Sequence, residues 1–110
     1  MKTNDAYLQH ILEAIEQIET YTEEVQRSEF MDHEMRQDAV IRQLEIIGEA
    51  SRQLSESFRN EHTSIPWHAI IGMRNRMAHD YLGVDLDVVW DVIQHDLPEL
   101  REKVHRLLVS

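Results

Sequence analysis

The chain has 110 residues and a net charge of −10, from 11 basic and 21 acidic side chains. It has no cysteine, which excludes disulfides and thiolate metal sites, and its three glycines and two prolines are fewer than turn-rich β architectures need. The acidic balance argues against a broad nucleic-acid-coating surface, but it leaves room for a small site in which one or two arginines bind a phosphate.

A chain of this length predicts a single domain over residues 1–110, with a core large enough to need no disulfide. No N-terminal apolar run indicates a secretory signal, and no apolar stretch approaches the roughly 20 residues that span a bilayer. The sequence therefore predicts a cytoplasmic protein with no membrane partner.

Apolar residues at helical spacing predict the first two helices, over residues 4–25 and 31–58. Thr3, Asn4 or Asp5 can cap the first of them. In the second helix, a polar stripe follows the same rhythm as the apolar stripe and is turned to roughly the opposite side. This polar stripe consists of Asp38, Arg42, Glu45, Glu49 and Arg52.

A polar loop over residues 59–64 separates the second helix from the third. We expect Ser64 to cap the third helix and Pro66 to lie in its first turn, where proline is tolerated. The apolar pattern then continues from Trp67, and the helix is expected to end before Gly83.

Asp85 is predicted to cap a fourth helix, whose apolar pattern runs to Leu107. Pro98 lies inside that pattern, so we expect a kink or a short break near it. Four helices with short connections predict an all-α fold, with an antiparallel four-helix bundle as the simplest packing.

The most informative stretch lies in the third helix, where residues 74–81 read Arg-Asn-Arg-Met-Ala-His-Asp-Tyr. At about 100° per residue, Arg74 falls in the middle of the apolar arc of this helix. A guanidinium cannot be neutralised, so its burial requires partners. Either Asp38 or Glu45 supplies an ion pair, or the arginine lines a cleft that receives an anionic ligand, and both interpretations can hold together.

His79 lies four residues after Asn75, on the stripe beside Arg74. An unperturbed imidazole titrates at about pH 6.5, so His79 can accept or donate a proton, although a histidine near a helix end is also commonly a plain polar residue. Arg74 and His79 are separated by about 140° on an ideal helix. They converge only if the arginine's length bridges the gap, if the helix loosens, or if a second subunit completes the site, which favours a symmetric dimer.

Arg74, His79 and Tyr81 follow the spacing Arg, four residues, His, one residue, Tyr, which resembles the signature of HepT-type HEPN ribonuclease toxins. Asn75, directly after the arginine, also resembles the family pattern. Further stretches that look like this family are 38–50 (D-A-V-I-R-Q-L-E-I-I-G-E-A), 65–67 (I-P-W), 71–75 (I-G-M-R-N), 83–85 (G-V-D) and 89–90 (V-W). The resemblance extends over about residues 35 to 100.

This resemblance implies a HEPN-like helical bundle that forms a homodimer with its active cleft at the two-fold interface. It implies the toxin of a type VII HepT/MntA toxin–antitoxin system, a metal-independent endoribonuclease that acts on RNA, with tRNA prominent among its targets. The implied partner is an MntA-like minimal nucleotidyltransferase antitoxin. That partner transfers AMP from ATP to the tyrosine of the motif, which here is Tyr81.

The residues of the motif can support RNA cleavage without a metal ion or a cofactor. The 2′-OH of the substrate attacks the adjacent phosphorus with His79 as general base or acid, while Arg74 stabilises charge on the phosphoryl oxygens. Asn75 can orient the imidazole or bind a phosphate oxygen. AMP on Tyr81 would occupy the phosphate position and exclude RNA, whereas the plain alternative for Tyr81 is an amphipathic core residue.

Two other classes of protein stay open. The same cleft can belong to a non-catalytic nucleotide-binding partner of a minimal nucleotidyltransferase, for which RNA stays intact with both the wild type and His79→Ala. A carboxylate-bundle metal enzyme needs paired Glu-x-x-His motifs. The sequence has one, Glu102 with His105, and Asp91 with His95 four apart; both are more typical of solvated helix faces, so we expect no metal site. A purely structural dimer is the residual alternative.

Overall fold

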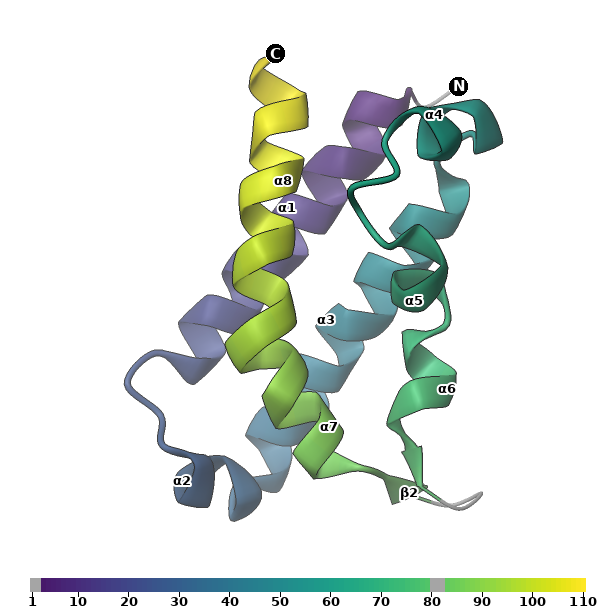
Figure 1. The fold of residues 1–110 in the computed structure, drawn as a ribbon. Helices are drawn as coiled ribbons and strands as arrows, with labels where there is room; N and C mark the ends of the chain where they lie inside the picture. Colours follow the sequence, from purple (N-terminus) through teal and green to yellow (C-terminus); the bar gives the residue numbers. More distant parts are fainter. Residues whose placement is uncertain (1–2, 80–82) are drawn as a thin grey trace.

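The computed structural model describes residues 3–79 and 83–110, and helices dominate them (Figure 1). The helices, in chain order, are α1 (Asn4–Thr22), α2 (Arg27–Met31), α3 (Glu34–Gln53), α4 (Glu56–Glu61), α5 (Trp67–Ile71), α6 (Met73–Met77), α7 (Leu86–Asp91), the π-helical turn η1 (Val92–Asp96) and α8 (Leu97–Val109). Two strands of two residues each, β1 (Ala78–His79) and β2 (Gly83–Val84), pair antiparallel. The predicted all-α class is confirmed.

Four helical segments surround the core: α1, α3, the α5–α6 segment and the α7–η1–α8 segment (Figure 1). Successive segments run in opposite directions along the long axis of the molecule, as an antiparallel bundle requires. α3 packs against α1 on one side and against α5 and α6 on the other, and α8 packs on α1. All four segments contribute to one cluster of buried apolar side chains, including Leu8, Ile11, Ile15, Val40, Leu44, Ile47, Ile70, Val89, Val92 and Val104.

Thr3 is the residue that caps α1, out of the three candidates. Its backbone is extended, with φ −85° and ψ 167°, and its side-chain oxygen accepts a hydrogen bond from the N–H of Ala6. The helix ends at Thr22, before the predicted residue 25, and Glu24 follows with a φ of 58°. A left-handed residue of this kind cannot continue a right-handed helix, which explains the earlier end.

The segment before α3 forms a short helix, α2, that the apolar pattern did not predict. Phe30 of α2 is completely buried, and its ring centroid lies 5.4 Å from that of Trp90. His33 caps α3, so this helix begins at Glu34 and the predicted start at residue 31 is wrong. A helix as short as α2 offers too few turns for a periodic pattern to emerge.

We expect Phe30→Ala to lower the free energy of unfolding by about 3–5 kcal/mol, because it empties a fully enclosed position in the core. Urea denaturation followed by circular dichroism measures this loss. Ser28→Ala, at an exposed position of the same short helix, is the matched control and should change stability by no more than about 0.5 kcal/mol. Equal stabilities of the two variants would show that α2 does not contribute to the core.

α3 also ends before the predicted residue 58. Leu54 leaves the helical region, with φ −62° and ψ 143°, and buries its side chain in the core. Ser55 then caps α4 by accepting a hydrogen bond from the N–H of Phe58. Since α4 runs to Glu61, the predicted loop over residues 59–64 is wrong in its first half.

The predicted third helix is two short helices, and it ends earlier than expected. Ser64 does not cap it, because Pro66 is the residue that precedes the first helical position. α5 stops at Gly72, where a Cβ would lie only 3.1 Å from the carbonyl oxygen of His68, closer than nearly all Cβ contacts. α6 follows and stops at Met77, after which the chain becomes extended in β1.

Asp85 caps α7 as predicted, since its carboxylate accepts hydrogen bonds from the N–H groups of Asp87 and Val88. The irregularity expected near Pro98 is present as the π-helical turn η1, which directly precedes α8. Pro98 itself lies in the first turn of α8, where a missing N–H is tolerated. The α7–η1–α8 segment therefore stays helical throughout, with a π-helical turn between its two α-helices (Figure 1).

The length and polarity of a helix decide whether it can span a membrane. The longest described helix, α3, has 20 residues and carries charged side chains along its length. Among residues 3–79 and 83–110, no helix is both long and apolar enough to cross a bilayer. The cytoplasmic location and the single domain over residues 1–110 stay predictions.

Candidate functional site

Arg74 lies on α6 beside two side chains that face the core. Met73 and Met77 are buried, whereas 83% of the Arg74 side chain is exposed. The prediction that Arg74 lies at the centre of a buried apolar arc is therefore wrong. That prediction assumed one continuous helix, whereas α5 and α6 are separated at Gly72, and Met73 and Met77 are the residues of α6 that face the core.

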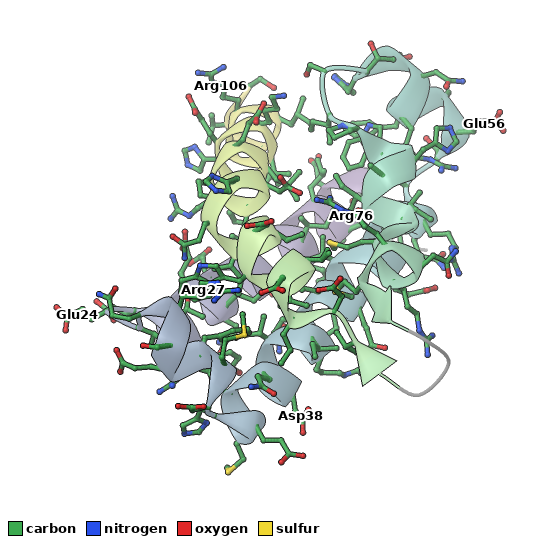
Figure 2. All side chains as sticks on the ribbon, turned by 60° about the horizontal axis from the view of Figure 1, so that its bottom comes forward. Glu24, Arg27, Asp38, Glu56, Arg76 and Arg106 are labelled. Atoms are coloured by element: carbon green, nitrogen blue, oxygen red, sulfur yellow. The ribbon has the colours of Figure 1, made fainter. Side chains whose placement is uncertain are left out.

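Glu45 of α3 is the ionic partner of Arg74, with 3.9 Å between Arg74 Nε and Glu45 Oε2. It is one of the two partners predicted from the sequence. The other, Asp38, is exposed on the first turns of α3 (Figure 2). It lines a separate hollow together with Val84. A separation of 3.9 Å is too long for a hydrogen bond, and a pair this exposed contributes less than about 1 kcal/mol. The guanidinium thus keeps its donors available for an anion.

Arg74 opens onto a groove between α3 and the α5–α6 segment, called here the Arg74 groove. The two pack together at Gly48, where a Cβ would lie 3.4 Å from the carbonyl oxygen of Ile70. The charged residues that line the groove are Arg42, Glu45, Glu49, Arg52 and Arg74. Its apolar residues are Leu44, Ile70, Ile71, Met73 and Met77. The polar stripe predicted on α3, without Asp38, therefore faces a neighbouring segment of the protein.

The rest of the predicted motif is described only in part. Asn75 is exposed on α6. The backbone of His79 lies in β1 and pairs with Gly83, so the prediction of a helix at this residue is wrong and the angle argued from an ideal helix does not apply. The side chain of His79 and the whole of Tyr81 lie outside what the structure describes. The roles of Arg74, Asn75, His79 and Tyr81 stay predictions.

The strands β1 and β2 fix the backbone on either side of residues 80–82. Ala78 pairs with Val84, and the N–H of Asp85 donates to the carbonyl oxygen of Met77 at 2.6 Å. Met77 lines the Arg74 groove and β1 follows it directly. The backbone of His79 thus continues from the α6 end of the groove.

Arg76, the second arginine of the motif, lines a different hollow, between the α5–α6 segment and the C-terminal segment. It donates from Nη1 to a carboxylate oxygen of Asp96 at 3.0 Å (Figure 2). Because Asp96 belongs to η1, this ion pair connects α6 with the last segment of the bundle. Arg76 is therefore a link between segments at the surface, apart from the Arg74 groove.

Metal ligands were not expected from the sequence. Within the described ranges, no group of three or more His, Asp and Glu side chains is placed to hold a metal ion. Glu102 pairs with Arg106 at 2.5 Å, and His105 is exposed. Asp91 and His95 are also exposed, so both candidate pairs lie on solvated helix faces in this part of the chain.

Comparisons with known proteins point to one family. A family model described as "Ribonuclease HepT-like" matches residues 11–107. The chain is 42% identical over 106 residues to "Probable ribonuclease HepT" of Thermococcus cleftensis, with 96% of each chain covered. It is 37% identical over 108 residues to a "Putative RNase" of Caldanaerobacter subterraneus, which covers 98% of this chain and 96% of the relative. No solved structure matches.

One relative is a longer protein. The chain is 43% identical over 102 residues to "Gamma-glutamylcyclotransferase and putative RNase" of Methanocaldococcus jannaschii. The match covers 93% of this chain and 46% of that protein, so the chain spans about half the length of this relative and nearly all of the other two. Because the family model matches residues 11–107, which are most of this chain, the chain belongs to the HepT-like ribonuclease family.

Proposed function

We propose that this protein is a ribonuclease toxin that cleaves RNA at the Arg74 groove without a metal ion. The observation that carries the proposal is the Arg74 side chain, which is 83% exposed beside the groove and whose guanidinium lies 3.9 Å from Glu45. A planar guanidinium matches two oxygens of a phosphate group at once. Membership of a ribonuclease family and relatives named as ribonucleases support RNA as the substrate.

In the proposed reaction, a base removes the proton of a ribose 2′-OH and the freed oxygen attacks the adjacent phosphorus. The bond from phosphorus to the 5′ oxygen breaks, and that oxygen takes a proton from an acid, which leaves a 2′,3′-cyclic phosphate and a 5′-OH. His79 is the base or the acid, and Arg74 donates to the phosphoryl oxygens as their charge grows. Asn75 orients the imidazole or binds a phosphate oxygen. A second copy of the chain, across a two-fold axis, supplies the second histidine.

We further propose that an MntA-like nucleotidyltransferase antitoxin controls this activity by attaching AMP to Tyr81. The paired strands support this idea, because they hold the backbone before and after residues 80–82 close to the α6 end of the groove. A phosphate there would compete with RNA for Arg74. The type VII toxin–antitoxin system, tRNA as target and the homodimer rest on the family resemblance and belong to this proposal.

Cleavage of tRNA in excess EDTA tests the proposed function. We expect the wild-type protein to cleave at an unchanged rate when the chelator is added, because the 2′-OH, the imidazole and the guanidinium need no metal ion. Denaturing gels measure the cleavage, and phosphatase treatment before and after acid identifies cyclic phosphate ends. DNA of the same sequence should stay intact, since it lacks the 2′-OH.

Two results would contradict this proposal in different ways. Cleavage that stops in EDTA and returns with magnesium would show a metal-dependent reaction. RNA that stays intact with the wild type, together with binding of ATP or AMP, would favour a non-catalytic nucleotide-binding protein.

A further inference from the structure

We propose that Arg42 and Arg52 of α3 form, together with Arg74, an extended phosphate-binding site that holds the RNA strand beyond the cleaved bond. This inference rests on the proposed ribonuclease function. It assigns a binding role to two residues outside the sequence motif, which the polar rhythm of α3 brings to the same groove.

The spacing along α3 sets the geometry of this site. Arg42 and Arg52 both line the Arg74 groove and lie about 15 Å apart along the helix axis, at a rise of 1.5 Å per residue. Glu45, the partner of Arg74, lies between them on the same face. The three guanidinium groups therefore follow the groove in the order Arg52, Arg74, Arg42.

The direction of this row relates it to the predicted catalytic histidine. α3 and the α5–α6 segment run antiparallel, because Gly48 lies against Ile70 and the earlier residue Glu45 lies against the later residue Arg74. Arg42 is therefore on the side of the groove that leads toward the end of α6 and into β1. A strand bound along the row passes Arg74 and continues toward the backbone of His79.

The charge of the groove differs from that of the whole chain. Its lining includes three arginines against two glutamates, whereas the chain has a net charge of −10. An excess of positive charge in a groove of an otherwise acidic protein attracts a polyanion to that groove. The acidic surface elsewhere repels RNA and so favours binding in this orientation.

The three arginines are also poorly satisfied by protein carboxylates. Arg52 Nη1 lies 3.5 Å from Glu49 Oε2, with about 60% of both side chains exposed, and Arg74 lies farther still from its partner. Arg42 has no hydrogen-bond or ion-pair partner among residues 3–79 and 83–110.

Several arginines elsewhere in the described chain have closer partners, such as Arg76 at 3.0 Å from Asp96 and Arg101 at 3.2 Å from Glu19, although the buried Nε of Arg59 has none among these residues. Phosphate oxygens can offer the groove arginines the short, charge-assisted hydrogen bonds that they lack.

The length of the row indicates a strand as the ligand in preference to a single nucleotide. With the two side chains extended away from each other, a row whose ends lie about 15 Å apart along the helix can contact several phosphate groups at once, as a strand offers them. The apolar residues between the arginines, among them Leu44 and Met73, offer a surface on which bases or riboses can lie. A short oligonucleotide can bind the arginines with its phosphates and place its bases on the apolar residues between them.

RNA affinity as a function of salt tests the extended site. In a His79→Ala background, which keeps the RNA uncleaved, we expect Arg42→Gln and Arg52→Gln each to weaken binding of a single-stranded oligonucleotide about tenfold. Each should also reduce the slope of log K against log salt by about 0.7, as the loss of one phosphate contact does for single strands. Arg101→Gln, an exposed arginine of α8, is the matched control and should leave affinity and slope unchanged.

Cleavage kinetics in the otherwise unmodified protein give a second readout. Both groove variants should raise the KM for a long RNA more than they lower its kcat, and the effect should be smaller for a dinucleotide that cannot span the row. Affinity and slope equal to those of Arg101→Gln would overturn the extended site, even while the wild type still cleaves RNA. Failure of the proposed function would look different, since the wild type itself would then leave RNA intact.

Discussion

Arg74→Ala is expected to slow RNA cleavage by about 10²–10³-fold, because it removes a positioned donor to the charge that develops on the phosphoryl oxygens. The stability of the protein should change little, since 83% of the side chain is exposed and its contact with Glu45 is long. Single-turnover cleavage of an oligonucleotide measures the rate, and urea denaturation measures the stability. The combination of a large kinetic loss with an unchanged fold identifies a functional arginine.

Two further variants make the test of Arg74 specific. Arg74→Lys keeps the positive charge but loses the planar fork, so it should recover only a small part of the rate. Arg106→Ala removes an exposed arginine of α8 that pairs with Glu102, and it should cleave as the wild type does. A wild-type rate in Arg74→Ala would contradict the proposed site, whatever the other variants show.

His79→Ala is expected to slow cleavage by about 10²–10⁴-fold, the range that proton transfer by a positioned side chain contributes. The expectation fits the backbone geometry, because β1 carries His79 directly beyond the α6 end of the Arg74 groove. The rate of the wild type should depend on pH through the protonation of the imidazole, and the residual rate of the variant should lose that dependence. Cleavage assays across a pH series measure both effects.

A histidine elsewhere in the chain provides the control for this experiment. His105→Ala changes an exposed position of α8, far along the chain from the motif, and should keep both the rate and the pH profile of the wild type. If His79→Ala kept the same profile as His105→Ala, the imidazole would have no part in the chemistry.

The predictable part of the fold is the part with long apolar periodicity. α1, α3 and the α7–η1–α8 segment have enough turns for their buried stripes to emerge from the sequence, and their caps Thr3 and Asp85 follow local rules. The break at Gly72 and the two-residue strands depend on how neighbouring segments pack, which no local pattern records. The prediction for Arg74 used the apolar arc of one continuous helix, which the structure does not have.

The candidate site, like the fold, was predictable from local patterns only in part. The motif predicted the candidate residues, whereas the helical arithmetic placed Arg74 in the middle of an apolar arc, and the structure has it exposed beside a groove. Arg42 and Arg52 were visible as members of a polar stripe. Their position on the Arg74 groove emerges only when α3 packs against α5 and α6, because a groove belongs to two segments and not to one.

The π-helical turn has a consequence for what this sequence can tolerate. From Val89 to Leu97, an ideal α-helix turns about 80° beyond two full revolutions, so the two side chains would point in different directions. Both are buried, because the wider turn of η1 absorbs the excess. Removing one residue from 92–96 would leave seven steps of a regular α-helix, about 700° and so close to two full turns, and Leu100 and Val104 of α8 would keep facing the core. Adding a residue there would turn both side chains away from the core by about 100°. This stretch therefore holds one residue more than a regular helix needs, and the protein should tolerate the loss of that residue better than a further addition.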